Sequence, residues 1–482
     1  MKKTLTFLLI ICCMAVTVCV SACNGNENKL SRYEIYASYD ESTGTVTGSV
    51  KLDFYNDTDN ELSDLKFNLY GNAFREGAKF KPVSDTYKTR AYYAGESYGK
   101  MEISGVENCA GWNVGGEDEN TLTVNLLTPI YPEETVTVTI NYTLTLAKVN
   151  HRTGITARTV NLGNFYPILC AYTSEGFLEC PYYYCGDPFV SECANYSVTI
   201  DLPPEYIAAS SGKLVSESET DGRKKCTYTL ENARDFAFVL SKDFKVVSDD
   251  ADGVSVNYYY INDENPQTGL GAATESIKYF SQTFGKYSYP TLSVVQTGFC
   301  YGGMEYPALT MIADGLDSDN TVYTIVHENA HQWWYAMVGS NQTTDAWQDE
   351  GLTEYSTLAF FETHAAYGFT RKGIINSATN YYRAFFNVFS QLNGTADTRM
   401  HRDLSEYTSE LEYNNVTYNK GLLLFDTLRN AAGDDKFFGI LKKYFESNRG
   451  KIAGYESLIA GFEGVAGAEN IFDSFLEGKI LI

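Results

Sequence analysis

The first half of the chain, from about residue 31 to residue 250, alternates hydrophobic and polar positions with a period of two. The clearest stretch is TVTVTINYTLTL, Thr135–Leu146, in which every second residue is apolar or aromatic. Such alternation, with many β-branched residues, predicts half-buried antiparallel strands. Clusters of Gly, Asn, Asp and Pro separate these stretches and predict turns. We therefore predict an N-terminal antiparallel β domain, a sandwich or a saddle, over residues 31–250.

After about residue 250 the hydrophobic pattern changes to that of helices. SIKYFSQTFG places Ile277, Phe280 and Phe284 on one helical face, and Gly285 after them is typical of a helix end. VYTIVHENAHQWWYAMVG predicts a longer helix that reaches its terminal glycine, and GLLLFDTLRNAAG and DKFFGILKKYFES predict further amphipathic helices. The chain is thus predicted to be a multidomain α+β protein. Its second domain, residues 251–482, is mostly helical, with a few strands such as TLSVVQTGF before the helices.

The N-terminus has the layout of a secretory signal. Two lysines precede the apolar run LTFLLIICCMAVTVCV, which is followed by small residues. The segment Val20–Cys23, VSAC, resembles the lipobox of bacterial lipoproteins, in which the signal is cut before a lipid-bearing cysteine. This resemblance implies a signal peptide at residues 1–22, lipidation of Cys23, a polar tether at residues 23–30, and an extracytoplasmic protein anchored to the cell membrane. The alternative is an uncleaved N-terminal membrane helix.

Length, charge and cysteines narrow the remaining possibilities. A chain of 482 residues exceeds one ordinary core, so two or three domains are expected. The formal net charge of −24 argues against nucleic acid as a partner, because phosphate binding needs a basic face. Seven cysteines follow the leader, so at least one is unpaired within the chain. Cys180 and Cys185 could pair or be free, and a zinc site that adds Cys193 is disfavoured because no second cysteine pair follows.

The segment VHENAHQWW carries the candidate chemistry. Residues four apart lie on one face of a helix, so His327 and His331 present two imidazoles to one point, with Glu328 beside them. Two nitrogen ligands and an adjacent carboxylate that can deprotonate a water are what a hydrolytic zinc site needs. Glu350, on a following helix, can supply the usual third ligand. The alternative is that the two histidines only pack within a helix.

Four residues in or near the motif have more modest predicted roles. Glu354 lies one turn after Glu350 and could accept a hydrogen bond from a ligand histidine, although a solvated helix glutamate is an equal alternative. Asn329 needs a hydrogen-bond partner if it is buried. Trp333 and Trp334 are expected to pack the ligand helix rather than touch substrate.

Together, HENAHQWW and WQDEG resemble the M1 family of zinc aminopeptidases, of the gluzincin clan. Two further motifs occur in the family's order: GGMEY (Gly302–Tyr306) is similar to its GxMEN motif, and YNNVTYNKG (Tyr413–Gly421) to its Tyr-x-Lys-Gly segment. The resemblance spans roughly residues 31–480 and implies a β domain followed by a thermolysin-like catalytic domain with one Zn²⁺. It also implies that Glu305 binds the α-ammonium of a peptide and that Tyr418 donates to the oxyanion.

The segment around Glu305 and the nearby Tyr413 have further expected roles. Gly302 and Gly303 lack side chains, so a peptide could lie against this edge and pair with it, and we include Met304 in the predicted substrate-binding segment. Tyr413 either lines the pocket or packs. Tyr306 replaces the Asn of the family motif, which puts the finer substrate contacts in doubt. Many members continue into a C-terminal helical domain, which we expect to be absent or reduced here, leaving a more open cleft.

The sequence therefore predicts a zinc-dependent aminopeptidase that acts on peptides with a free N-terminus. In this prediction Glu328 is the general base for attack of water on the first peptide bond. A thermolysin-like endopeptidase would not need Glu305, and a non-catalytic peptide-binding lipoprotein would not need Glu328. The preferred N-terminal residue, the physiological substrate, the oligomeric state and any disulfide pairing are left open.

Overall fold

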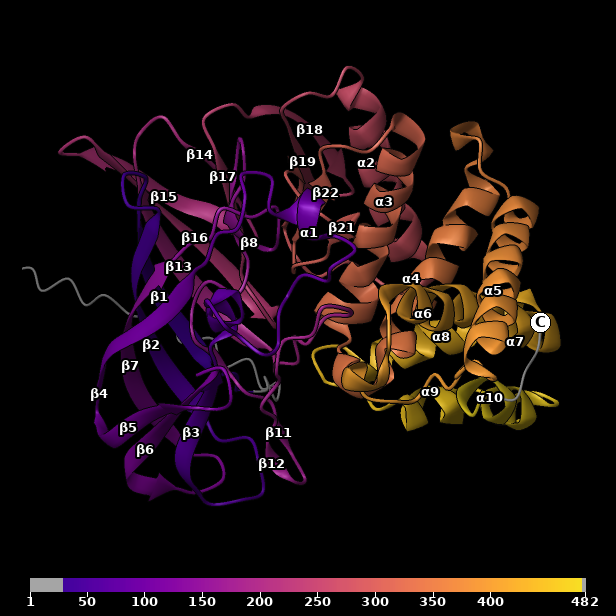
Figure 1. Ribbon diagram of the computed structural model, residues 1–482, viewed down its shortest axis with the longest axis horizontal. Coiled ribbons are helices and arrows are strands. Elements are labelled where there is room, and N and C mark those ends of the chain that lie inside the picture. Colours follow the sequence, from indigo (N-terminus) through magenta and orange to yellow (C-terminus); the bar gives the residue numbers. More distant parts are fainter. Residues whose placement is uncertain (1–28, 479–482) are drawn as a thin grey trace, which may run out of the picture.

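The computed structural model describes residues 29–478, in which a β-rich half precedes a helical half (Figure 1). This order confirms the predicted multidomain α+β class. The predicted signal peptide, the cleavage site and Cys23 lie outside the described residues. Within residues 29–478, no helix combines the length and hydrophobicity needed to cross a membrane.

A seven-stranded sheet forms the body of the β-rich half. The predicted strand Thr135–Leu146 is one of its members, and Val138, Ile140, Tyr142 and Leu144 are buried, which confirms the alternation. All neighbouring strands are antiparallel except the first and the thirteenth, which run parallel. In spatial order the strands are β15 (Lys213–Thr220), β16 (Arg223–Ala233), β13 (Ala194–Leu202), β1 (Arg32–Asp40), β2 (Thr45–Tyr55), β7 (Thr135–Thr145) and β4 (Lys100–Glu107).

Smaller sheets complete this half. Side chains of the large sheet and of these smaller sheets share one hydrophobic core. The second sheet has the order β10 (Ile168–Leu169), β3 (Leu62–Asn68), β6 (Thr121–Ile130) and β5 (Cys109–Gly115). The third has the order β14 (Ile207–Ser210), β17 (Phe238–Ser241), β9 (Val160–Leu162) and β8 (Thr153–Ile155), and a hairpin joins β11 (Tyr172–Thr173) to β12 (Gly176–Phe177). Two short helical turns, η1 (Tyr70–Phe74) and α1 (Lys88–Ala91), lie between these strands in the chain.

A five-stranded sheet introduces the second half. Its order is β18 (Lys245–Ala251), β19 (Val254–Tyr260), β20 (Thr291–Thr297), β22 (Leu309–Ala313) and β21 (Gly303–Met304), so β21 is an edge strand. The predicted strand TLSVVQTGF is β20. The predicted domain boundary at residue 250 cuts through β18, because this strand pairs with β19. The change from one sheet system to the next therefore falls between β17 and β18, a few residues earlier than predicted.

Helices pack beside this sheet (Figure 1). The predicted helix end at Gly285 is confirmed, since the first long helix stops at Thr283 and Gly285 has a positive φ. The helices are α2 (Pro266–Thr283), α3 (Ser318–His331), α4 (Gln342–Thr363), α5 (Arg371–Asn393), α6 (Glu410–Asn414), α7 (Lys420–Ala432), α8 (Asp434–Asn448), α9 (Tyr455–Gly461) and α10 (Ala468–Leu476). Short 3₁₀ turns are η3 (Ala365–Tyr367) and η4 (Leu404–Glu406), and π-helical turns are η2 (Gln332–Met337) and η5 (Asn415–Asn419).

The two π-helical turns adjoin residues with predicted roles. The helix predicted to run to Gly339 is α-helical only as far as His331, and η2 continues it. The other turn, η5, carries Tyr418 between α6 and α7. Single π turns inside α-helices are frequently found at functional sites, because the wider turn redirects the side chains that follow.

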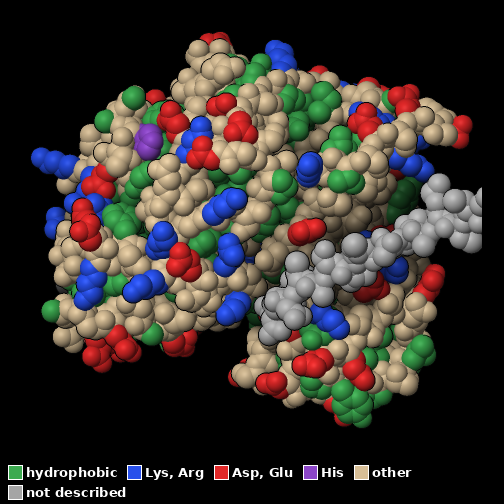
Figure 2. Space-filling view, turned by 180° about the vertical axis from the view of Figure 1, so that it is seen from behind, with side chains coloured by type: hydrophobic (Ala, Val, Ile, Leu, Met, Phe, Trp, Pro, Cys, Tyr) green, Lys and Arg blue, Asp and Glu red, His purple; other side chains and the backbone are tan. Residues whose placement is uncertain are grey.

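The surface carries charges of both signs, and the cysteines of the described range are unpaired. Figure 2 shows acidic and basic side chains intermingled over one face of the molecule. The seven cysteines in the described range are free thiols, and all except Cys109 are buried. Cys180 and Cys185 are thus unbonded, and neither they nor Cys193 belong to a group that could hold a metal among residues 29–478.

Candidate active site

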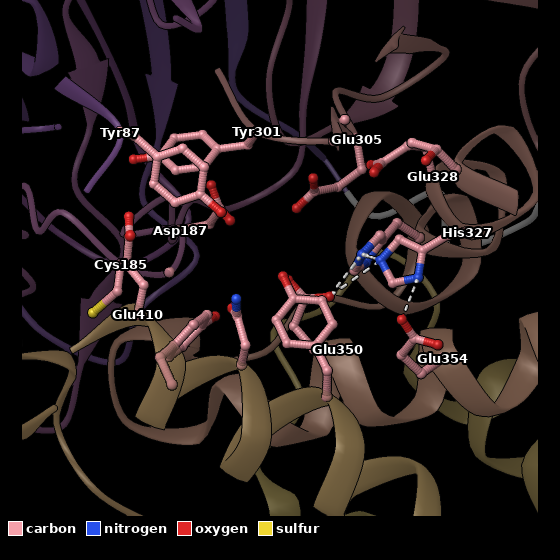
Figure 3. Close-up of a pocket in the computed structure, with 18 of the residues that line it drawn as sticks. Tyr87, Cys185, Asp187, Tyr301, Glu305, His327, Glu328, Glu350, Glu354 and Glu410 are labelled. Carbon is pink, nitrogen blue, oxygen red and sulfur yellow. Dashed lines mark hydrogen bonds and ion pairs between the residues drawn. The ribbon is translucent and has the colours of Figure 1, made fainter. Parts of the chain in front are cut away.

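A cavity of about 440 Å³ lies where the β-rich half meets the helices (Figure 3). Helix α3 contributes His327, Glu328 and His331 to its wall, and α4 contributes Glu350. The β-rich half contributes Asp187, among others. Residues from both halves of the chain therefore surround one space, and the predicted zinc ligands face it.

The three predicted zinc ligands converge. His331 Nε2 lies 3.1 Å from His327 Nε2 and 3.1 Å from Glu350 Oε2, which lies 3.3 Å from His327 Nε2. Donors about 2.0–2.1 Å from a tetrahedral zinc ion are about 3.3 Å apart, so these spacings fit one ion. Glu350 Oε2 is buried and faces both imidazole nitrogens at these distances. Two nitrogens and a carboxylate oxygen are also the donor set that suits zinc.

Carboxylates behind the two histidines fix the orientation of their rings. His331 Nδ1 lies 2.7 Å from Asp349 Oδ1 and 3.0 Å from Thr353 Oγ1. His327 Nδ1 lies 3.4 Å from Glu354 Oε1, and Glu354 also accepts a 2.6 Å hydrogen bond from the Tyr323 hydroxyl. Such partners hold the ring nitrogen that faces a metal in the deprotonated form. The structure thus places Glu354 where we predicted an acceptor, and it adds Asp349, which the sequence analysis missed.

Glu328 lies between the ligand histidines and the edge strand β21. Burial raises the pKa of its carboxyl to about 7, although the imidazoles of His327 and His331 oppose the shift. A general base works best when its pKa is near the working pH, so this environment suits proton transfer at neutral pH. A Cβ atom at Gly303 would lie 2.3 Å from Glu328 Oε1. Gly303 is therefore required for the close approach of Glu328, a reason that the sequence analysis did not identify.

Glu305 follows β21 and points into the same cavity (Figure 3). Only 4 % of its surface is exposed, and its Oε1 has no hydrogen-bond partner among residues 29–478. Ligating atoms of Glu305, Glu328 and His331 lie within 4.8 Å of one another. Burial raises the pKa of Glu305 well above its usual value, against the opposing effect of His331. An unpaired buried carboxylate is costly, so this position favours a cationic ligand.

The other residues of this segment divide between the cavity and the core. Gly302 and Gly303 line the cavity, as predicted for the substrate edge. The prediction of Met304 as a substrate contact is wrong for its side chain, which is fully buried and accepts a 2.9 Å hydrogen bond from Arg152 Nε to its Sδ. Alternation along the strand explains the difference, because Met304 points to the face opposite Gly303 and Glu305.

Tyr418 reaches the zinc ligands from η5. Its hydroxyl donates a 2.5 Å hydrogen bond to Glu350 Oε1, and its ring stacks on His327 with 5.9 Å between centroids. Burial, and then the nearby Glu350 carboxylate, raise the pKa of Tyr418 well above its usual value, so the hydroxyl keeps its proton. Tyr413 lines the cavity and is also buried against Tyr407, so both readings of this residue apply.

The structural expectations for the motif's remaining residues are confirmed. Asn329 is fully buried, and its Nδ2 donates a 3.0 Å hydrogen bond to Ser276 Oγ. Trp333 and Trp334 are buried away from the cavity, where Trp334 Nε1 donates to Ser356 Oγ on α4 at 2.8 Å. The ligand helices are thus held together behind the site.

Two residues from the β-rich half complete the wall. Arg152 and Asp187 form a buried ion pair, and the Arg152 guanidinium also donates to the Tyr182 hydroxyl at 3.3 Å. Burial raises the pKa of Asp187 to about 6, although Arg152 lowers it. Neither residue lies in a motif recognised in the sequence. Their place in the cavity wall could not be predicted, because only the tertiary fold brings this part of the chain next to the zinc-ligand helices.

An HExxH helix with a glutamate ligand from the next helix, set beside a β-rich half, defines the class of gluzincin-type zinc metallopeptidases. Residues 268–477 match the family model described as the peptidase family M1 domain. The helical half of the chain is thus similar to the peptidase family M1 domain.

Individual proteins with similar sequences or structures share low sequence identity with this chain. The chain is 23% identical over 285 residues to tricorn protease-interacting factor F2 of Thermoplasma acidophilum. This alignment covers 57% of this chain and 35% of that protein. It is 24% identical over 275 residues to human endoplasmic reticulum aminopeptidase 2, covering 51% and 27%. The chain thus spans about a third of the length of these curated relatives. The crystal structure of an M1 zinc metallopeptidase from Deinococcus radiodurans superposes with a TM-score of 0.67 at 18% identity, covering 94% of this chain and 95% of that one, and shares its fold.

Proposed function

We propose that this protein is a zinc-dependent aminopeptidase that releases N-terminal residues from peptides. One observation carries the proposal: the buried carboxylate of Glu305, whose Oε1 has no hydrogen-bond partner among residues 29–478, shares a cavity with the zinc-ligand set and with Glu328. An endopeptidase needs the ligands and the base, but it has no use for an anion that recognises a free amine.

The spacing of these groups supports cleavage of the first peptide bond. In a peptide the first carbonyl carbon is two bonds, about 2.5 Å, from the α-nitrogen. An α-ammonium held by Glu305 therefore brings that carbonyl next to Glu328 and His331, whose ligating atoms lie within 4.8 Å of Glu305. The free edge of β21 at Gly303 can pair with the substrate backbone as an added strand.

Each residue then has a defined task. The zinc ion that His327, His331 and Glu350 would hold supplies Lewis acidity toward the peptide carbonyl and makes a water more acidic. Glu328 takes the proton of the attacking water and delivers it to the leaving amine. Tyr418 turns its hydroxyl from Glu350 toward the carbonyl oxygen and donates to it as negative charge develops there.

Fluorogenic aminoacyl amides, free and N-acetylated, test the proposal. The purified protein is expected to cleave the free amides, to lose this activity with a zinc chelator, and to leave acetylated amides intact. Glu305→Ala should lower kcat/KM on free amides by about 100-fold or more, since a charged hydrogen-bonded contact is lost. Equal cleavage of acetylated amides would instead indicate a thermolysin-like endopeptidase, and no cleavage by zinc-loaded protein would indicate a peptide-binding protein.

For localisation, we propose an extracytoplasmic protein anchored through a lipid on Cys23. The support is the sequence alone: a charged start, an apolar run and the VSAC segment. Growth with an alkyne fatty acid is expected to label the protein, and Cys23→Ala should abolish the label and release the protein from membranes. A Cys23→Ala protein that stays labelled would contradict lipidation at this residue.

A further inference from the structure

The cavity contains a carboxylate, Glu410, that has neither a task in the proposed reaction nor an ion-pair partner among residues 29–478. Glu410 begins α6 and lines the cavity. Figure 3 places it beside Cys185 and below Tyr87, at the end of the cavity opposite His327. Only 9 % of the residue is exposed, and neither carboxylate oxygen has a hydrogen-bond partner within residues 29–478. A buried carboxylate without a partner is costly, which points to a missing ligand.

The other acidic groups of the cavity already have partners or tasks. Asp187 is paired with Arg152, and Glu354 with His327 and the Tyr323 hydroxyl. The three remaining glutamates are the zinc ligand Glu350, the base Glu328 and the amine contact Glu305. Glu410 is left over, so the function proposed above does not explain its burial.

Helix stabilisation alone does not account for Glu410. An acidic residue in the first turn favours a helix through the helix dipole, but it can do so from an exposed position and does not need to be buried. The N-cap role is filled by Ser409, whose Oγ accepts from the backbone N–H of Glu412 at 3.2 Å. The Ser84 hydroxyl is close enough to lower the pKa of Glu410, although no hydrogen bond of ordinary geometry joins the two side chains; burial is the larger cause, and the pKa is raised.

Aromatic rings surround this end of the cavity. Tyr87 and Tyr301 meet edge to face, with 5.0 Å between ring centroids, and Tyr184 lines the same wall. The Tyr301 hydroxyl donates to backbone carbonyls of Pro82 and Tyr184, at 3.1 and 3.3 Å. The Tyr184 hydroxyl donates to the Tyr407 carbonyl at 3.0 Å. These hydroxyls are therefore engaged, and the rings offer their faces and edges.

The two cations of the cavity wall do not neutralise Glu410. Arg152 is held by Asp187, with its guanidinium 5.5 Å from the Tyr301 ring centroid. Arg90 is exposed, and it makes no hydrogen bond or ion pair to Glu410 in the described part of the chain. A carboxylate among aromatic rings, without a cation of its own, is the environment that binds an ammonium or guanidinium group.

We propose that Glu410, with the rings of Tyr87, Tyr184 and Tyr301, forms the subsite for a cationic side chain on the N-terminal residue of the substrate. The substrate class is peptides that begin with Arg or Lys. Such a peptide carries two nearby cations: the α-ammonium goes to Glu305 and the side-chain cation to Glu410. This proposal rests on the proposed aminopeptidase function and adds its side-chain preference.

Matched pairs of fluorogenic amides isolate the side-chain charge. Arginyl is compared with citrullyl amide, and lysyl with norleucyl amide, because each pair differs little in shape. In the unaltered protein we expect kcat/KM to be about 10- to 100-fold higher for the charged member, the usual worth of a charge-assisted contact. Glu410→Gln should bring both ratios close to one. Asp85→Asn, which removes an exposed carboxylate near Ser84, is the matched control and should leave both ratios unchanged.

The outcomes separate this proposal from the proposed function. Charged-to-neutral ratios below two in the unaltered protein would overturn the subsite, whether or not Glu410→Gln folds. Ratios that persist in a folded Glu410→Gln variant, judged by its circular dichroism spectrum, would overturn the role of Glu410. If no amide is cleaved, the proposed function fails, and calorimetric binding of argininamide against citrullinamide tests the subsite by the same ratios.

Discussion

Gly303→Ala tests whether Glu328 acts from the position seen in this structure. The new Cβ would lie 2.3 Å from Glu328 Oε1 and 2.5 Å from its Cδ, whereas ordinary contact begins at 3.4 Å. The carboxylate must therefore move by about 1 Å, a displacement that typically lowers catalysis about 100-fold. Gly303 does not have a positive φ, so the backbone accepts alanine and stability should change by no more than about 1 kcal/mol.

Steady-state kinetics on a free aminoacyl amide, with zinc content measured on the same sample, give the result. We expect kcat to fall about 100-fold at full zinc occupancy. Gly315→Ala is the control, because a Cβ there meets no atom within 4 Å. In a Glu328→Gln background, Gly303→Ala should cause little further loss, since both changes act on one group. A Gly303→Ala enzyme within three-fold of full activity would refute the assigned position of Glu328.

Three further predictions concern Tyr418, Asp349 and Asp235. Tyr418→Phe should lower kcat by roughly 100-fold, about 3 kcal/mol, with KM and zinc content little changed, and a loss confined to KM would contradict the oxyanion role. Asp349→Asn should weaken zinc binding about 10- to 100-fold in a chelator competition, because His331 loses its orienting carboxylate, and unchanged affinity would contradict this. Burial raises the pKa of Asp235 to about 7, above the usual 3.8, so the folded protein retains a proton that the unfolded chain releases. The free energy of unfolding should therefore fall by up to about 4 kcal/mol as pH rises from about 4 to 7, and Asp235→Asn should reduce this slope in urea titrations.

The periodicity of hydrophobic residues was sufficient to predict which segments are strands and which are helices, but not how these elements are arranged in space. In β7 the buried side chains follow the alternation, because one face of the sheet packs on the core. The parallel pairing of β1 with β13, however, joins segments far apart in the chain, and no local pattern specifies it. The boundary near residue 250 was misplaced for the same reason, since β18 resembles the preceding strands and only its pairing with β19 assigns it to the second sheet.

The zinc-ligand set was predictable because helix geometry fixes it. His327 and His331 are one turn apart, and α4 runs beside α3 so that Glu350 meets them. Asp349 was missed although it precedes Glu350 directly. The available signal was the presence of two consecutive carboxylates on the helix that supplies the third zinc ligand. Asp187 could not be found in this way, because it comes from the β-rich half and reaches the site only through the tertiary fold.

Tyr306 shows how a departure from a family motif acquires a structural role. Its ring is fully buried, and its hydroxyl donates a 2.6 Å hydrogen bond to Asn164 Oδ1, whose Nδ2 donates to Asp235 at 2.7 Å. Its backbone carbonyl accepts a 3.1 Å hydrogen bond from Gln332 Nε2, one residue after His331. The segment that carries Glu305 is thus fixed on one side to the β-rich half and on the other to the zinc-ligand helix. Because hydrogen-bonded partners on both sides limit its movement, Glu305 and the zinc ligands keep the short spacing on which the proposed cleavage of the first peptide bond depends.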